Sequence, residues 1–119
     1  MLYEIIVSGI ILLVLDSIYF YVNQKLIMNQ LKHTPFRVKI NQLGAFFSYI
    51  FLISGLYFFI IRKKRPIYEA FLLGIIIYGV YDATSYALLL DYSPDLAVID
   101  TIWGGILLGI TTKIVYTII

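Results

Sequence analysis

The sequence predicts an all-α polytopic membrane protein, in which four transmembrane helices form an antiparallel bundle. Hydrophobic residues make up 61% of the 119 residues and charged residues only 13%, whereas charged residues make up about 25% of a soluble globular domain. The charged residues are concentrated in short connections between long apolar runs. Each apolar run is close to the ~20 residues that cross a hydrocarbon core of ~30 Å. These observations predict a single transmembrane domain.

The four predicted spans cover residues 4–22, 43–61, 67–90 and 96–117, separated by polar breaks at 23–42, 62–66 and 91–95. Consecutive spans therefore run in opposite directions. The first apolar run is interpreted as a permanent helix and not as a cleaved signal peptide. No basic segment precedes it, and Asn23-Gln24-Lys25 is not a small-residue cleavage site.

The first two connections carry most of the basic residues. The first, at 23–42, is predicted to contain a short interfacial helix that breaks before Pro35, because the residue before a proline is pushed out of the α region. The second contains the basic run at 62–65, RKKR. This run has two interpretations, topogenic charge under the positive-inside rule or a binding site for an acidic lipid headgroup. The density of basic residues near helix ends favours a cytoplasmic location for this run and for both termini.

Three of the predicted spans carry an aspartate where a lipid-facing helix should have none. An acidic side chain near mid-bilayer costs roughly 2.5–3.5 kcal/mol on insertion scales, so such residues usually face a bundle interior, a partner or water. With a helix rise of about 1.5 Å per residue, Asp16, Asp82 and Asp100 lie roughly 9, 12 and 6 Å inside the same membrane face. The sequence therefore predicts that the three acids meet at one level of the bundle.

Hydroxyl, indole and glycine residues near these acids complete a predicted intramembrane polar cluster. Its candidate residues are Asp16, Tyr19, Tyr78, Tyr81, Asp82, Thr84, Ser85, Asp100, Trp103 and Gly104. No lysine, arginine or histidine is expected at this depth, so a buried ion pair is not predicted to neutralise the acids. Desolvation and neighbouring acids both favour the neutral form of Asp82, the deepest of the three. We therefore expect Asp82 to be neutral or balanced by a bound cation, and Trp103 and Tyr81 to point into the bundle.

Other features predict packing or exclude classes of site. Gly44, Ser48 and Gly55 fall on one stripe of the second span, which predicts close packing against a neighbouring helix. The chain has no cysteine, which excludes disulfides and thiolate metal sites. The formal charge of +2 lies mostly in the connections, which favours contact with lipid headgroups over nucleic-acid binding. The sequence predicts no cofactor and no metal centre.

The stretches around the three acids read LDSIYF, YGVYDATSY and IDTIWGG. They resemble the motifs of a family of small four-helix membrane proteins of unknown function, known mainly from bacteria. In that family an aspartate followed by an aromatic residue lies in the first helix, a YxxYDxTN-like motif in the third and a VDxxWG-like motif in the fourth. Ser85 stands where the family usually has asparagine. The resemblance implies a four-helix fold and a location in the cell membrane, and it implies no reaction.

The predicted cluster leaves three classes of function open. In a structural or accessory component of a membrane assembly, the acids are protonated and hydrogen-bonded, or line a water-filled vestibule, and hold helices together. In a transport unit they handle a proton, a cation or a small solute, and so few helices then imply a homo-oligomer. In an intramembrane lipid-modifying enzyme they serve as general acid and base or as magnesium ligands. The structural or accessory role is favoured.

The expected partners follow from these classes. They are the lipid bilayer itself, further copies of the chain or other subunits of a membrane assembly. Lysine is more frequent than arginine and Ile, Tyr and Asn are frequent, a bias typical of an AT-rich genome. This composition fits a bacterial cell membrane, an organelle membrane or the internal membrane of a large virus.

Overall fold

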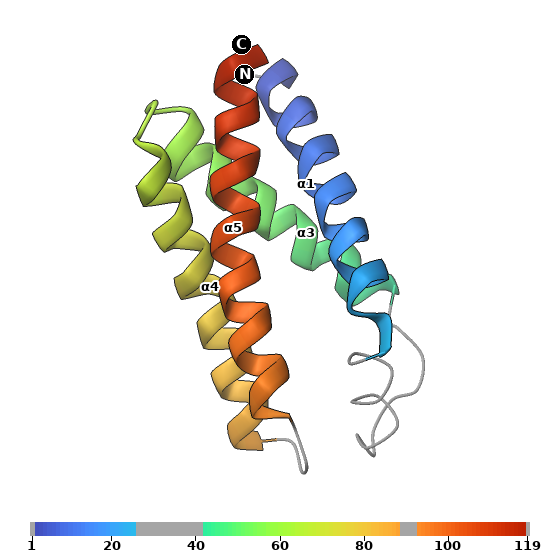
Figure 1. Ribbon diagram of the computed structural model, residues 1–119. Coiled ribbons are helices and arrows are strands. Elements are labelled where there is room, and N and C mark those ends of the chain that lie inside the picture. Colours follow the sequence, from blue (N-terminus) through green and yellow to red (C-terminus); the bar gives the residue numbers. More distant parts are fainter. Residues whose placement is uncertain (1, 26–41, 89–92, 119) are drawn as a thin grey trace.

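The computed structural model describes residues 2–25, 42–88 and 93–118, which form an antiparallel bundle of long helices (Figure 1). The elements are α1 (Leu2–Val22), α3 (Gln42–Leu56), the π-helix η1 (Tyr57–Ile61), α4 (Ile67–Leu88) and α5 (Pro94–Ile118). Helix η1 continues α3, so the described residues contain four helical segments that are long and apolar enough to cross a membrane. This confirms the all-α class and the four predicted spans.

The four segments alternate in direction, and α5 lies at the centre of the arrangement in Figure 1. Helix α4 pairs with α5 along its length, and α1 runs beside α5 in the opposite direction. Helix α3 crosses obliquely behind α5 and contacts α1. The two termini lie at the same end of the bundle. With 25 residues, α5 is about 37 Å long at ~1.5 Å per residue, enough to cross the hydrocarbon core.

The helix bounds differ slightly from the predicted spans, most informatively at α5. This helix begins at Pro94, before the predicted start at Leu96. The Leu96 backbone N–H donates to the Ser93 hydroxyl at 3.2 Å, which satisfies one of the free N–H groups of the first turn. Pro94 suits the first helical position because its fixed φ matches a helix and its missing N–H is not needed there. The predicted interfacial helix within 26–41 and the predicted end of the third span at 89–90 lie outside the described residues.

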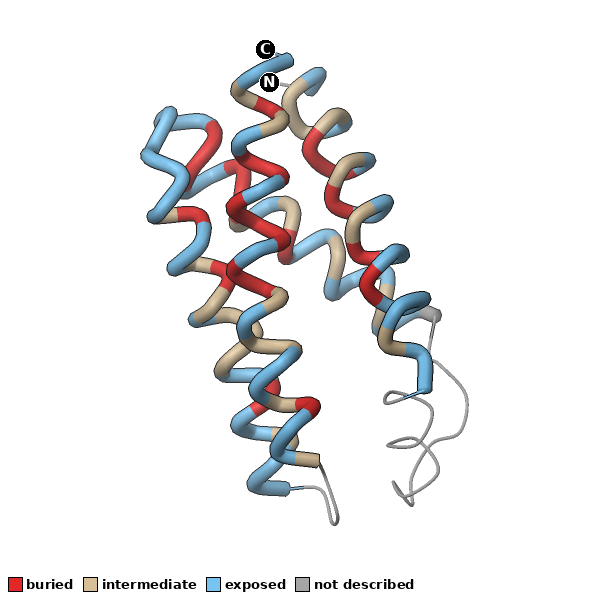
Figure 2. Tube along the Cα trace, in the orientation of Figure 1, coloured by how far each residue is buried: buried red, intermediate tan, exposed pale blue. Residues whose placement is uncertain are grey.

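The bundle is apolar on its outer surface as well as in its core. Leu12, Leu56, Leu107 and Leu108 are completely buried between helices. Large side chains such as Phe51 remain mostly exposed, and the outward faces of the helices are largely unburied in Figure 2. In water this much exposed apolar surface would promote association, whereas in lipid it matches the surrounding acyl chains. The protein is therefore a membrane protein.

Helices α4 and α5 approach each other closely at glycines. A Cβ atom placed on Gly74 would collide with the Gly104 carbonyl group and would lie 2.9 Å from the Gly105 Cα. A Cβ on Gly105 would lie 2.8 Å from Cγ1 of Ile75. Small residues permit such backbone contact between membrane helices, where van der Waals packing replaces the hydrophobic effect. The spacing of α4 and α5 therefore depends on Gly74, Gly104 and Gly105.

Among the described residues, the small residues of the second span are not closely packed at Ser48 and Gly55. Gly44 and Ser48 are exposed, and a Cβ placed on Gly55 would meet no atom within 4 Å. Helical spacing identifies a stripe of small residues but does not say which way the stripe faces. In the described part of the chain, the tightest glycine contacts given lie between α4 and α5.

The end of the second span is a π-helix, a feature that the sequence did not predict. The Arg62 N–H donates to the Tyr57 carbonyl at 2.8 Å, five residues back, which is the bonding pattern of a π-helix. From α5, the Tyr116 hydroxyl lies 3.2 Å from the Ile60 carbonyl and 2.8 Å from the Arg65 carbonyl. This tyrosine ties the end of η1 and the following turn to α5.

We expect Gly74→Ala to lower the free energy of unfolding by about 1–3 kcal/mol, the usual cost of overpacking. The added methyl would press on the α5 backbone, which cannot move aside as a flexible side chain can. Gly55→Ala is the matched control, because the same methyl enters open space there and removes the helix penalty of glycine, about 1 kcal/mol. Denaturant titration of helical circular dichroism in detergent measures both. Equal stability of the two variants would contradict the proposed role of Gly74.

The helix order predicts that residues 25 and 64 lie on opposite sides of the membrane. The chain has no native cysteine, so single Lys25→Cys and Lys64→Cys variants provide unique labels. In sealed vesicles of one orientation, an impermeant maleimide should label one variant directly and the other only after the vesicles are opened. Labelling of both variants from the same side would refute the four-span arrangement.

Candidate functional site

Three aspartates from three different helices come together inside the bundle. Asp16 on α1 is 4% exposed and Asp82 on α4 is 1% exposed, while Asp100 on α5 is partly buried. The carboxyl groups of Asp82 and Asp100 are within hydrogen-bonding contact, and Asp16 lies close enough to Asp100 for electrostatic repulsion. We call Asp16, Asp82 and Asp100 the aspartate cluster.

Asp16 is held by two donors from two other helices. The Trp103 indole Nε1 of α5 donates to Asp16 Oδ1 at 3.1 Å. The Tyr49 hydroxyl of α3 donates to Asp16 Oδ2 in a short hydrogen bond. Both oxygens of this carboxyl group therefore have a partner, and one side chain connects α1 with α3 and α5.

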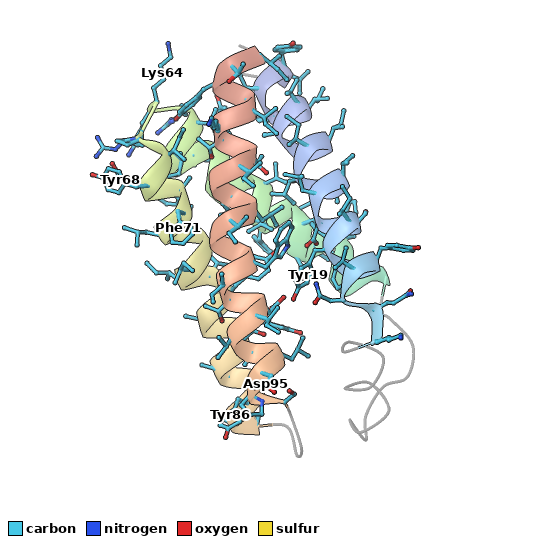
Figure 3. The ribbon with its side chains drawn as sticks, in the orientation of Figure 1. Tyr19, Lys64, Tyr68, Phe71, Tyr86 and Asp95 are labelled. Carbon is cyan, nitrogen blue, oxygen red and sulfur yellow. The ribbon has the colours of Figure 1, made fainter. Side chains whose placement is uncertain are left out.

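Asp100 and Asp82 share a second set of contacts. The Tyr19 hydroxyl of α1 donates to Asp100 Oδ1 at 3.0 Å, and Figure 3 shows Tyr19 on the side of α1 that faces α5. The Thr101 hydroxyl lies 3.4 Å from Asp82 Oδ2 and donates to the Ala97 carbonyl at 2.8 Å. At 3.4 Å the contact with Asp82 is weaker than the bond to Ala97. The Asp82 carboxyl group thus contacts both Asp100 and Thr101 of α5.

Aromatic rings pack around the carboxyl groups. The rings of Tyr19 and Trp103 are stacked, with centroids 4.9 Å apart and planes 7° apart. This stacking aligns the Tyr19 hydroxyl with Asp100 and the Trp103 indole with Asp16. The Tyr78 ring lies directly against Gly104, where an added Cβ would overlap the ring. Gly104 is therefore needed to seat Tyr78, which lies within electrostatic range of Asp16 and Asp100.

The remaining predicted candidates lie on α4, and Tyr81 is within electrostatic range of Asp82 and Asp100. Tyr81 is 66% exposed and Thr84 is also exposed, so the expected inward position of Tyr81 differs from the structure. Tyr81 is hydrogen-bonded to Ser85. With Val80 and Leu88, these three residues line a shallow cavity of about 320 Å³ on the surface of α4. Successive residues on a helix are about 100° apart, so adjacent motif positions face different surroundings.

Tyr49 and Thr101 contact the aspartate cluster in addition to the ten predicted candidates. Tyr49 lies on α3, a span without a charged residue, and only its hydroxyl in an otherwise apolar stretch indicates an interior partner. Thr101 follows Asp100 directly, but its hydroxyl reaches toward Asp82 of the neighbouring helix. In both cases the relevant signal is which side of a helix faces its neighbour, which requires the packed structure.

The chemistry of the aspartate cluster is that of neutral donors around acids. Within residues 2–25, 42–88 and 93–118, Tyr and Trp side chains donate to Asp16 and Asp100, while Thr101 and Asp100 lie beside Asp82. The same residues contain no group of three acidic or histidine side chains placed to hold a metal ion. The arrangement suits hydrogen bonding and proton sharing between carboxyl groups.

Comparison with curated proteins and with solved structures gave no match. Residues 1–117 match a protein family described as "Predicted membrane protein (DUF2177)", so nearly the whole chain is covered. That description agrees with the four apolar helices and with a location in a membrane. The chain belongs to the DUF2177 family of predicted membrane proteins.

Proposed function

We propose that this protein is a structural or accessory component of its membrane, in which the aspartate cluster holds the four spanning helices together. The observation that carries this proposal is the continuity of the polar contacts. From Tyr49 on α3 they pass to Asp16 on α1 and then to Trp103 on α5. Helix α1 also reaches α5 through Tyr19 and Asp100, and Asp100 reaches Asp82 on α4. Each of the four spanning helices therefore supplies at least one residue to this chain of contacts.

Carboxyl oxygens of the aspartate cluster already accept hydrogen bonds from the protein, which favours a structural role over an open active site. Both oxygens of Asp16 accept hydrogen bonds from the protein, and one oxygen of Asp100 does so as well. A catalytic acid or a magnesium ligand must instead present a free oxygen to its substrate or ion. Interhelical hydrogen bonds in membranes average about 0.6 kcal/mol and reach about 1.7 kcal/mol. Several such bonds in one network are enough to select a single helix arrangement.

A second candidate function, proton handling, is supported by the contact between Asp82 and Asp100. Two carboxyl groups can form a hydrogen bond only when one of them carries a proton. A proton on this pair is therefore available for exchange if water reaches it. A transport role would additionally require further copies of the chain, because four helices rarely enclose a pathway alone.

We expect Asp82→Asn to fold and insert normally and to lose less than about 1 kcal/mol of unfolding free energy, because the amide keeps a donor and an acceptor at this position. Asp82→Ala should lose about 1–3 kcal/mol, since it removes the buried carboxyl group that contacts Asp100. Chemical unfolding in detergent, followed by circular dichroism, measures both. Failure of Asp82→Asn to insert would contradict the proposed structural role.

Infrared spectroscopy of the same variant separates the two candidate functions. If the pair only holds helices together, the carboxylic-acid C=O band that Asp82→Asn removes should not change with external pH. If the pair exchanges protons, that band should titrate in the wild type and the titration should be absent from the variant. A pH-dependent band would replace the structural proposal with the proton-handling one.

We expect Tyr49→Phe to lower the free energy of unfolding by about 1 kcal/mol, the scale of an interhelical hydrogen bond in a membrane. The substitution leaves Asp16 Oδ2 without its donor and removes the cluster's contact with α3. Tyr68→Phe is the control, because Tyr68 is 65% exposed and lies on the outer side of α4. A Tyr49→Phe variant as stable as Tyr68→Phe would show that α3 does not depend on this contact.

A further inference from the structure

The turn between η1 and α4 presents three exposed cations that the proposed function does not use. Arg62, Lys63 and Lys64 are exposed, and within the described residues none of them pairs with an acidic side chain. Arg65 differs, because its Nε and NH2 groups donate to the two Glu69 oxygens at 3.0 and 2.7 Å. Glu69 thus neutralises one charge of the basic run and leaves the other three available. We call Arg62, Lys63 and Lys64 the basic turn.

The basic turn is held in one conformation by contacts on both sides. Lys64 has φ 53, a left-handed backbone conformation that is uncommon for a residue other than glycine. The Lys64 N–H donates to the Ile61 carbonyl at 3.1 Å and the Arg65 N–H donates to the Ile60 carbonyl at 2.9 Å. Tyr116 on α5 donates to the Arg65 carbonyl. The cations are therefore presented on an anchored backbone, and the nearby carbonyl groups already have donors.

The surroundings of the basic turn combine positive charge with exposed aromatic surface. The Arg62 guanidinium lies 4.9 Å from the centroid of the Phe58 ring, and this ring is 53% exposed on the outer side of η1. Lys64 and Tyr68 point away from the bundle in Figure 3. Because the turn ends a membrane-spanning helix, the cations lie at headgroup depth and the Phe58 ring lies at acyl-chain depth. A guanidinium stacked on a ring still has N–H groups free to donate to a phosphate.

We propose that the basic turn binds the phosphate of an anionic phospholipid in the adjacent leaflet, with the lipid's acyl chain packed along Phe58. Positive charge that only orients a membrane protein needs no particular geometry. Here one arginine is neutralised by Glu69, another is stacked over a lipid-facing ring, and the backbone that carries the lysines is tied to α5. This arrangement matches the amphiphilic shape of a phospholipid, whereas free phosphate would gain nothing from the ring.

Native mass spectrometry of the full chain tests this proposal. The protein is reconstituted in vesicles of equal amounts of phosphatidylcholine and phosphatidylglycerol, extracted in mild detergent, and its retained lipids are counted. Wild type should retain phosphatidylglycerol in preference to phosphatidylcholine, and Arg62→Gln/Lys63→Gln/Lys64→Gln should lose the preference. Each removed charge is expected to weaken retention about fivefold. Retention of the full preference by the triple variant would overturn the proposal.

Two controls distinguish a defined site from general positive charge. Arg65→Gln/Glu69→Gln removes an ion pair of the same turn without changing net charge, and Lys25→Gln removes one exposed charge near the end of α1. Both should keep the wild-type preference, and loss of the preference in either would refute a site at the basic turn. If the triple variant does not fold by circular dichroism, Arg62→Gln and Lys64→Gln are measured singly. Unchanged retention in both would also refute the site.

Inorganic phosphate at the concentration of the lipid should not displace phosphatidylglycerol, and displacement would show that the acyl chain plays no part.

Discussion

The presence of three carboxyl groups inside the bundle is the constraint on which the rest of the described structure depends. An isolated charged carboxylate is very costly in an apolar interior, and even a neutral acid must satisfy its hydrogen-bonding groups there. The protein meets this requirement with donors from neighbouring helices, namely the Tyr49 and Tyr19 hydroxyls and the Trp103 indole. Each donor reaches a carboxyl group only if its helix has the observed rotation and depth. The polar contacts therefore select one packing from the many that apolar surfaces alone would allow.

The close approach of α4 and α5 is the second requirement of the cluster. The contact between Asp82 and Asp100 needs these two helices nearly in backbone contact, and Gly74 against Gly104 and Gly105 provides that spacing. Gly104 also leaves room for the Tyr78 ring. The glycines that follow Trp103 thus have a packing role that keeps the acids together, and not a role in binding a ligand directly.

The two regions of interest differ in depth and in accessibility. The aspartate cluster lies inside the bundle, and its carboxyl groups are used within the protein. The basic turn lies at the end of a span, and its cations point outward. Helix η1 contributes to both the core and the basic turn. Its buried residues Tyr57 and Ile60 pack in the core, while the exposed Phe58 ring lies beside Arg62. A π-helix places successive side chains at other angles than an α-helix does, which allows this short segment to contact both the core and the outer surface.

The membrane class, the four spans and a common level for Asp16, Asp82 and Asp100 could be predicted from the sequence alone. These features follow from quantities that run along one helix axis, because span length and residue depth depend only on composition and on the rise per residue. The rotation of each helix about its own axis cannot be obtained in this way, because it depends on which neighbouring helix each face contacts. The packed structure is needed to see that Tyr49 reaches Asp16, that Tyr81 and Thr84 are exposed, and that Gly74 and not Gly55 makes a close helix contact. Helices with an apolar surface on all sides carry little signal for this rotation, and it is decided by the polar contacts and glycine contacts that form when the helices pack.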